Sequence, residues 1–411
     1  MLFALIANLN LHFWLIDFAR AYLNSKPQGI NYLEILQGFK NHYKIPGVDT
    51  VLIMNLTIYG TMDGANNWFC LLNKTFTELS HHQSRADPCM RIQNTTEGYT
   101  ISSTYTNDIS AGSSSVVTMD QAKRELAAKF KITDLGTPNK VLSMSIMNHT
   151  SGDISIHQKP LITKALVTFR MENANPKYTP LPPGINLVDS QPMPIPPNDT
   201  KFMCDKDYRS VLGMLNHIAN GTRPDIAFSV MILMHYASDP HPTHWRLVQH
   251  LLAYLKTTSN LVITYRKDGV VKPYGYSDSS YADESDTWKS SAGFVFISSG
   301  GPVSWKAKTQ RRVSTSTGEA EYVGVFEAGK QAKWVCSWFY EVDQYFNLPI
   351  TIYYDNDAAV ALTKNFGGHT KIKHVNVKTH WIREAINLDD IIVVPIDTAE
   401  NIADIFMKSL S

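Results

Sequence analysis

The part of the chain from about residue 271 onward has the pattern that most restricts the fold. Strand-like runs come first, then a long helical stretch, and after it strands and helical stretches alternate. In order, these runs are KPYGYSD (272–278), SAGFVFIS (291–298), PVSWKAK (302–308), a helix from about 318 to 344, ITIYYD (350–355), DAAVALTKN, VNVKTHWIREAINL, IIVVPI and NIADIFMKSL. The order βββαβααβα predicts a five-stranded mixed sheet with flanking helices, an α/β fold of the α+β kind.

The rest of the chain divides into three further segments. Residues 1–175 mix short apolar runs with helical stretches, which indicates a first α/β domain. Prolines cluster over 176–205, and because proline-rich chain is extended and semi-rigid, this stretch is the predicted linker. Residues 206–270 have helical patterns and predict a small bundle, which leaves 271–411 as the last domain.

The composition is that of a folded, aromatic-rich protein without a strong overall charge. Hydrophobic residues make up 44% and charged residues 18% of the 411 residues, which excludes a mainly disordered or fibrous chain. The formal net charge is +1, so contact with nucleic acid has to come from local basic patches. Four widely spaced cysteines give neither a zinc spacing nor a disulfide scaffold, and fit a reducing compartment.

The apolar N-terminal stretch, MLFALIANLNLHFWLIDFA, is predicted to be core structure. It has no basic start and no small-residue cleavage site, and polar residues interrupt it before the roughly 18 apolar residues that a membrane span needs. We therefore expect no membrane contact and a cytoplasmic location, with an element particle or the nucleus as alternatives. The stretch also begins abruptly inside such structure, which suggests a missing upstream part.

The long helix carries two glutamates that face different ways. At 100° per residue, Glu321 lies within the apolar arc and Glu319 lies on the opposite side. A carboxylate turned toward a core is costly unless it is paired or binds a cation. We therefore interpret Glu319 as a solvated surface acid, whereas for Glu321 we favour a functional role.

Two predicted strands close on an aspartate, at Asp278 and Asp355. Strand ends beside a helix are where α/β folds place catalytic groups, although a single aspartate there is more often a turn former. Together with Glu321, these acids supply the hard oxygen ligands that Mg²⁺ prefers, and two such ions can promote in-line phosphodiester cleavage. The combination predicts a two-metal site, with Mn²⁺ as a possible substitute.

The stretch SWKAKTQRR is basic, with no acid in it. Trp305 stands beside Lys306 and Lys308, and Arg311 and Arg312 follow. Basic side chains with an aromatic neighbour can bind a phosphate backbone, and a solvated strand face is an equally good reading.

Many ordered motifs resemble the C-terminal part of copia-type retrotransposon Pol polyproteins. The ribonuclease H (RNase H) domain of that family is matched by YSDSSYADESDTWKSSAGFVFISSGGPVSWKAKTQRRVSTSTGEAEYVGVFEA, IYYDNDAAVALTKN, KIKHVNVKTHWIRE and ENIADIFMKSL. Its connecting segment is matched by YRSVLGMLNHIANGTRPDIAFSVMILMHYASDPHPTHWRLVQHLLAYLK, and its reverse-transcriptase palm by LIDFARAYLNS, ILQGFK, LTIYGTMDGANNWF and SRADPC. The resemblance implies a palm over 1–175, a helical thumb or connection over 206–270 and an RNase H domain over 271–411.

The resemblance also implies site residues. The family's four metal-binding carboxylates fall on Asp278, Glu321, Asp355 and Asp404, of which Asp404 rests mainly on the resemblance. The substrate that it implies is an RNA/DNA hybrid, in which the 2′-OH marks the strand to be cut. Neither His374 nor His380 can be assigned as an acid or base, and a surface or structural role is expected for both.

The polymerase motifs depart from the family pattern. The first palm aspartate matches Asp17, but the usual Tyr-Val-Asp-Asp hairpin reads Tyr-Thr-Asn-Asp here, with Asn107 before Asp108. Asparagine offers an oxygen but no charge, so a two-cation site loses much of its attraction for metal. The family's fingers, which would precede residue 1, are also missing.

Three hypotheses follow. The first is a Mg²⁺-dependent RNase H, an endonuclease attached to a degenerate reverse-transcriptase remnant. The second is a nucleic-acid-binding remnant without catalysis. The third is an active RNA-directed DNA polymerase that takes its fingers from another chain, and Asn107 counts most heavily against it.

Overall fold

The computed structural model describes residues 1–43, 50–183, 197–281, 288–342, 349–356, 360 and 373–408. The chain forms two compact units, a smaller unit of Asn10–Pro138 and a larger unit of Phe3–Leu9 with Asn139–Ser411. Both units combine sheets with helices, so the predicted mixed α/β class is confirmed. The predicted division at residues 175, 205 and 270 remains a prediction. Residues 139–183 belong to the larger compact unit, although most of them fall in the predicted first domain.

The smaller unit is built on a six-stranded sheet in the order β4-β5-β6-β7-β1-β8. Trp14, Ile16 and Phe18 of β1 are buried among side chains of α3 and α4, which explains the continuous apolar run of this strand. A short ribbon of β2 and β3, with η1 and α2, completes the unit. Its elements are β1 (His12–Phe18), η1 (Ala21–Asn24), β2 (Tyr32–Glu34), α2 (Lys40–Tyr43), β3 (Val51–Ile53), α3 (Gly64–Glu78), β4 (His81–Gln83), β5 (Met90–Thr95), β6 (Gly98–Tyr105), β7 (Asp108–Ser113), α4 (Val116–Lys129) and β8 (Ile132–Gly136).

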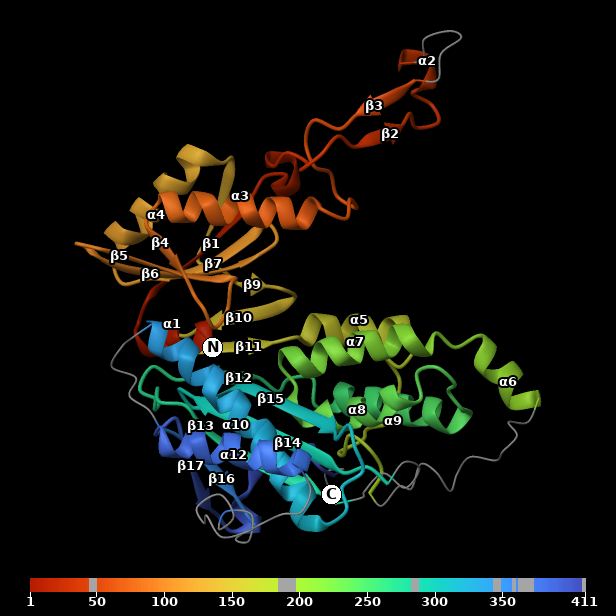
Figure 1. Ribbon diagram of the computed structural model, residues 1–411. Coiled ribbons are helices and arrows are strands. Elements are labelled where there is room, and N and C mark those ends of the chain that lie inside the picture. Colours follow the sequence, from red (N-terminus) through yellow and green to blue (C-terminus); the bar gives the residue numbers. More distant parts are fainter. Residues whose placement is uncertain are drawn as a thin grey trace. The chain divides into compact units, whose positions relative to one another are not determined.

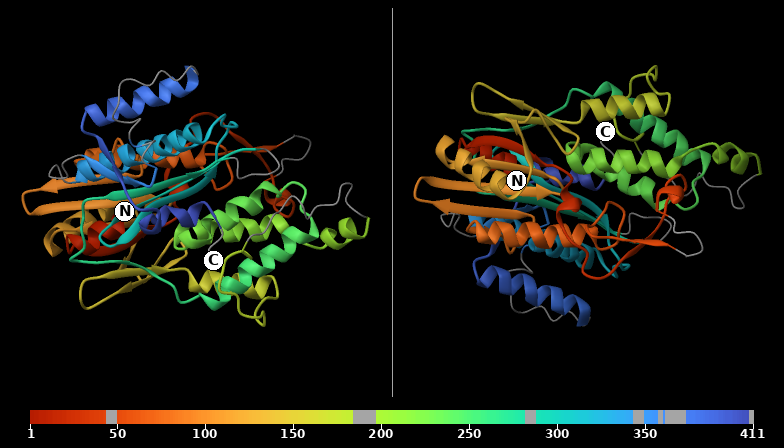
Figure 2. Two further views of the ribbon diagram at one scale, coloured as in Figure 1. Left: turned by 90° about the horizontal axis from the view of Figure 1, so that it is seen from below. Right: turned by 90° about the horizontal axis from the view of Figure 1, so that it is seen from above.

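The larger unit begins with a small antiparallel sheet and a group of helices. The sheet has the order β12-β11-β10-β9, and both views of Figure 2 show the green helices lying together. The elements are α1 (Leu2–Asn8), β9 (Lys140–Val141), β10 (Met144–Asn148), β11 (Ile154–His157), α5 (Lys159–Thr168), α6 (Pro197–Cys204), α7 (Tyr208–Gly221), η2 (Pro224–Ile226), α8 (Ala227–His235), α9 (Pro242–Thr257) and β12 (Ile263–Tyr265).

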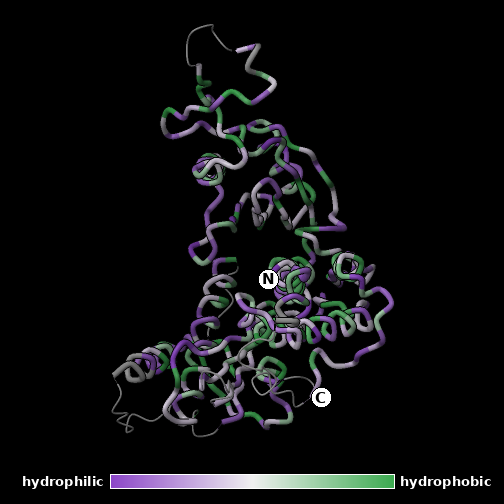
Figure 3. The backbone as a smooth tube through the Cα atoms, turned by 90° about the vertical axis from the view of Figure 1, so that its right-hand side faces the viewer, coloured by the Kyte–Doolittle hydropathy of each residue, from purple (hydrophilic) through white to green (hydrophobic). Residues whose placement is uncertain are grey.

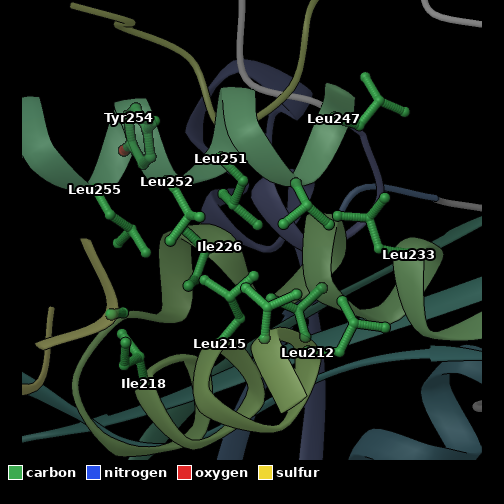
Figure 4. Close-up of a cluster of buried hydrophobic side chains, with 14 of the residues drawn as sticks. Leu212, Leu215, Ile218, Ile226, Leu233, Leu247, Leu251, Leu252, Tyr254 and Leu255 are labelled. Atoms are coloured by element: carbon green, nitrogen blue, oxygen red, sulfur yellow. The ribbon is translucent and has the colours of Figure 1, made fainter. Parts of the chain in front are cut away.

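A leucine-rich core holds these helices together. Leu212 and Leu215 of α7, Leu233 of α8, and Leu251 and Leu252 of α9 point toward one another (Figure 4), and each is at most 2% exposed. Burying a leucine side chain stabilises a fold by roughly 1.5 to 3 kcal/mol, so this cluster is a main source of stability. The stretch 206–270 is largely helical, as expected, and its helices share this core with Ile162 and Leu166 of α5.

The second sheet of the larger unit has five strands in the order β15-β14-β13-β16-β17. The first three are antiparallel neighbours, whereas β13, β16 and β17 are parallel, so the predicted five-stranded mixed sheet is confirmed. Figure 1 shows α10 and α12 beside this sheet. The elements are β13 (Tyr274–Ser280), β14 (Ser291–Ser298), β15 (Gly301–Thr309), α10 (Thr317–Val342), β16 (Ile350–Tyr354), α12 (Lys373–Asn387), β17 (Ile391–Pro395), η3 (Thr398–Glu400) and η4 (Ile402–Phe406).

Three expected elements differ or lie outside the described residues. Pro197–Cys204, within the predicted linker, forms helix α6. The predicted last helix is a short 3₁₀ helix, Ile402–Phe406, rather than an α-helix. The stretch DAAVALTKN falls almost entirely outside the described residues, apart from Val360.

The apolar N-terminal stretch is core structure, as predicted. Helix α1 buries Ala4, Leu5, Ile6 and Ala7, and β1 follows it. Figure 3 shows hydrophobic and hydrophilic residues mixed along the tube. Within the described ranges, no helix combines the length and apolar character that a membrane crossing requires.

Candidate functional site

Strand pairing brings two of the predicted acids side by side. In the parallel pair β13–β16, Ser277 is the register partner of Tyr354. Asp278 and Asp355 are the next residues on the two strands, and because parallel neighbours run in the same direction, they reach the same edge of the sheet. Asp278 lies inside β13, which continues to Ser280, and Asp355 directly follows β16.

Helix α10 packs very closely against β13 and carries Glu321 to this edge. A Cβ atom on Gly324, one turn after Glu321, would lie 1.8 Å from the Oγ of Ser279. Only glycine allows this approach. Across the gap, the Tyr354 hydroxyl donates a hydrogen bond of 2.5 Å to Oε2 of Glu321 and lies 3.2 Å from Ser279 Oγ. Tyr354 is fully buried, so this contact fixes the carboxylate from inside the core.

The fourth acid approaches from the other face of the sheet. Gly293 of β14 is the register partner of Asp278, and a Cβ on Gly293 would lie 2.4 Å from the Cβ of Phe406 in η4. A second contact anchors this segment, since the Asn401 amide donates a hydrogen bond of 3.1 Å to the Ser277 carbonyl. Asp404 of η4 is half-buried and forms an ion pair with Lys408.

The four acids interact electrostatically. The pKa of Asp278 is raised to about 7, first by burial and next by the negative charge of Asp355, with smaller contributions from Glu321 and Asp404. Burial also raises the pKa of Glu321, while hydrogen bonds from Tyr354 and Asn356 oppose that rise. Mutual repulsion among these half-buried carboxylates is what a bound cation would relieve.

The donor set fits magnesium in its chemistry. All four side chains are carboxylates, the hard oxygen ligands that Mg²⁺ prefers. In the described ranges, however, no three Asp, Glu, His or Cys side chains gather closely enough to form a cation site as they stand. The acids therefore influence one another's charge without already adopting ligand geometry.

The helix-face prediction for α10 is confirmed. The predicted apolar arc is buried, including Tyr322 and Val325, which are 3% and 0% exposed. Glu319 instead bonds locally at the start of the helix, where its carboxylate accepts hydrogen bonds from the backbone N–H and the hydroxyl of Thr315. Glu319 and Glu321 thus have different surroundings two residues apart.

Trp305 does not share a surface with the cations of the basic stretch. Trp305 donates a 2.9 Å hydrogen bond from its indole to the Ala219 carbonyl of α7, so it serves packing within the larger unit. Lys306 and Lys308 alternate with it along β15 and point to the other face, where Lys308 lies 3.4 Å from Glu327 of α10. Arg311 and Arg312 follow β15 and are both exposed. Nucleic-acid binding by these residues remains a prediction.

The three palm residues are also close together. Asp17 and Asp108 are register partners in the β1–β7 pair, and Asn107 belongs to the two-residue turn before β7. The Asn107 amide donates a hydrogen bond to Oδ1 of Asp17. Burial, and then the charge of Asp17, raises the pKa of Asp108. The asparagine therefore uses the palm aspartate as a hydrogen-bond acceptor.

Sequence reasoning missed the residues that position the acids. Tyr354 reads as a strand residue, Gly324 as a weak point in a helix, and Gly293 as one glycine in an apolar strand. An isolated glycine inside a regular element is a signal of close backbone approach, and it could have indicated both contacts. Nothing in the local pattern singles out Tyr354.

The sequence is similar to known proteins over almost its whole length. Residues 1–183 match the family model described as reverse transcriptase (RNA-dependent DNA polymerase). The chain is 30% identical over 408 residues to the retrovirus-related Pol polyprotein from transposon TNT 1-94 of Nicotiana tabacum, covering 98% of this chain and 30% of that one. It thus spans under a third of that relative's length.

Two solved structures show weaker likeness. The foamy viral protease-reverse transcriptase in complex with RNA/DNA hybrid gives a TM-score of 0.49 at 11% identity, over 94% of this chain and 44% of that one. RNase H1 from Halobacterium salinarum gives a TM-score of 0.24 at 19% identity, over 32% of this chain and 89% of that one. On the family match and the sequence relatives, the chain belongs to the copia-type retrotransposon Pol polyproteins, and its residues 1–183 to the reverse transcriptase family.

Proposed function

We propose that the carboxylate site of the larger unit hydrolyses the RNA strand of RNA/DNA hybrids, with Mg²⁺ as cofactor and Mn²⁺ as a substitute. The observation that carries the proposal is the arrangement of the acids: β13 and β16 bring Asp278 and Asp355 to one edge of the sheet, α10 brings Glu321 there, and the charges of Asp355, Glu321 and Asp404 act on Asp278. Four carboxylates drawn from a sheet, a helix on one face and a 3₁₀ segment on the other are difficult to explain by stability, because each repels the next.

In this proposal, Asp278, Glu321, Asp355 and Asp404 hold the metal. When bound, two Mg²⁺ ions would stabilise the attacking and leaving oxygens of an in-line displacement. Tyr354 orients Glu321 through its hydroxyl, so the carboxylate meets the substrate in one preferred rotamer. Lys408 neutralises part of the charge on Asp404 through their ion pair.

The test is an assay of the purified chain on a labelled RNA/DNA hybrid with Mg²⁺, beside duplex RNA and duplex DNA of the same sequence. We expect cleavage of the hybrid alone. Glu321→Gln should lower the rate by at least about 100-fold, because it removes a charge meant for the metal. The matched control is Glu319→Gln, which lies two residues away and should cleave at nearly the normal rate.

We also propose that the palm of the smaller unit does not polymerise DNA. The support is Asn107, a neutral amide at a position where the family has a carboxylate. Its amide donates a hydrogen bond to Asp17. A two-metal mechanism needs carboxylate charge at this position. Primer extension on an RNA template should therefore be undetectable, and robust extension would overturn this part of the proposal.

A second candidate function is nucleic-acid binding without catalysis. It is favoured by one observation, that no three acidic side chains among the described residues are already gathered for a cation. The same assay separates the two functions. Hybrid binding without cleavage, at every Mg²⁺ and Mn²⁺ concentration tried, would select the binding function.

A further inference from the structure

A compact group of cations covers the outer side of α10, away from the four acids. Lys308 of β15, Arg312 after it, Lys330 of α10 and Lys378 of α12 form this group, which we call the basic face. Lys308 and Lys330 share one carboxylate, that of Glu327, at 3.4 and 3.0 Å. Three elements that are distant in sequence thus contribute to a single surface.

Two of these cations lie over the aromatic ring of Phe326. The ammonium of Lys330 lies 4.7 Å and that of Lys378 lies 5.6 Å from the ring centre of Phe326. The Trp381 ring packs edge-on against Phe326 at 5.3 Å, which holds the phenylalanine in place. A ring face attracts a cation, but two cations on one ring also repel each other.

The basic face carries more positive than negative charge. Burial lowers the pKa of Lys378, the charges of Glu327 and Glu319 raise it, and those of Lys330 and Arg312 lower it. Lys306 and Arg311, both exposed, extend the surface along β15. Glu327 neutralises part of this charge through its ion pairs with Lys308 and Lys330, and the remaining surplus of positive charge favours the approach of an anion.

We propose that the basic face binds the phosphate backbone of nucleic acid at a point separate from the carboxylates. The inference rests on the proposed function, since it assigns a second contact to the same substrate. Lys330 follows Glu321 by nine residues, which is about 13 Å along the helix and half a turn around it. The basic face therefore contacts phosphates at a distance from the bond that is cleaved.

Backbone contacts of this kind have a measurable signature. Each phosphate neutralised by Lys or Arg contributes about 0.9 to the slope of log affinity against log salt concentration. Four contacts predict that the slope falls by about 3 to 4 when all four cations are removed. Because phosphates are common to all nucleic acids, duplex DNA should lose affinity by a similar factor.

The test uses the full chain with Lys308, Arg312, Lys330 and Lys378 each replaced by Gln. Binding of a fluorescent hybrid is measured by anisotropy in EDTA, where no hydrolysis is needed. The matched control replaces four exposed lysines elsewhere in the larger unit, Lys159, Lys164, Lys177 and Lys201, and has the same net charge. We expect an affinity loss of at least about tenfold in the first variant and little in the control.

Two further measurements separate binding from folding. Thermal unfolding should be similar in both variants, and replacing Lys308, Lys330 and Lys378 by Arg should restore affinity, because the charge returns. In the hydrolysis assay, the basic-face variant should raise KM and leave kcat unchanged, as expected for uniform binding. Equal affinity and equal salt slope in the Gln variant and the unmodified chain would overturn the inference. A chain that binds but never cleaves would overturn only the proposed function.

Discussion

The Tyr354 hydroxyl donates a hydrogen bond of 2.5 Å to Oε2 of Glu321 and lies 3.0 Å from the Glu321 backbone carbonyl. One buried tyrosine therefore fixes both the side chain and the helix turn of a candidate metal ligand. Tyr354 also directly precedes Asp355. Tyr354 thus contacts Glu321 directly and is the chain neighbour of Asp355.

Replacing Tyr354 with Phe should separate the position of Glu321 from the fold. The ring remains and the hydroxyl is lost, so we expect the free energy of unfolding to fall by about 1 to 2 kcal/mol. Hybrid hydrolysis should fall about tenfold or more, and a higher Mg²⁺ concentration should recover part of it, because a free carboxylate binds metal less well. The measurements are denaturant unfolding and a Mg²⁺ titration of the rate. A rate and a Mg²⁺ dependence identical to those of the unmodified chain would refute the positioning role.

The close approach of α10 to β13 predicts a strong effect of a single methyl group. Gly324→Ala places a Cβ 1.8 Å from Ser279 Oγ, so the helix has to shift. We expect a loss of about 1 to 3 kcal/mol in stability and a further loss of activity, because Glu321 moves with the helix.

The control for that substitution lies at the start of the same helix. At Gly318, an added Cβ meets no described atom within 4 Å, so Gly318→Ala should be neutral or stabilising by up to about 1 kcal/mol. Chemical denaturation of both variants provides the comparison. Similar stability in the two would mean that the helix and strand are less closely packed than the structure indicates.

The smaller unit should lose stability in acid through His81. This side chain is 5% exposed, packs edge-on against Phe76, and has no hydrogen-bond partner on either ring nitrogen among the residues that the structure describes. Burial, and next the charge of Arg91, lowers its pKa from the ordinary 6.5 to about 4. Between pH 6.5 and 4, His81 therefore binds a proton in the unfolded chain but not in the folded unit. The stabilisation is complete above pH 6.5 and declines by about 3 kcal/mol as the pH falls toward 4.

Substitution tests this directly. His81→Leu should flatten the dependence of the unfolding free energy on pH between 6.5 and 4, because the titrating group is gone. His82→Gln, at the exposed neighbouring position, should change the dependence only slightly, because the charge of His82 is the smallest of the three influences on the His81 pKa. A pH dependence that survives in His81→Leu would assign the acid sensitivity to another group.

Restoring the acid at Asn107 should make the palm sensitive to metal. Asn107→Asp places a third negative charge beside Asp17 and Asp108, and removes the amide hydrogen bond to Asp17. Without divalent cations we expect a stability loss of at least about 1 kcal/mol, and Mg²⁺ should reverse much of it. Thermal unfolding with and without Mg²⁺ measures both effects. If Mg²⁺ stabilises the unmodified palm to the same extent, the asparagine does not weaken the site.

Helical and strand periodicity predicted the sheet and the orientation of α10 well. The apolar arc through Tyr322 and Val325 is a local pattern, and burial follows it directly. The proximity of Asp278 and Asp355 follows from the observed parallel pairing of β13 with β16, because parallel neighbours end at the same edge.

The missing predictions concern tertiary contacts. Trp305 was grouped with the lysines beside it in sequence, but strand alternation turns it toward Ala219 of a helix some 86 residues earlier. Tyr354 can position Glu321 only because α10 lies close enough to β16 for its hydroxyl to reach the carboxylate. This close approach depends on Gly324. The basic face joins Lys308 to Lys378 across 70 residues, which no local pattern records.

The most direct test of the proposed chemistry is Mg²⁺-dependent hybrid cleavage by the unmodified chain and by Asp278→Asn. The asparagine has nearly the same volume but no charge, so the variant should fold normally and cleave at least about 1,000-fold more slowly. Replacing Mg²⁺ with Ca²⁺ should suppress cleavage by the unmodified chain, because the larger ion relaxes the geometry of in-line attack. Cleavage of the hybrid that Asp278→Asn leaves unchanged would contradict the central claim.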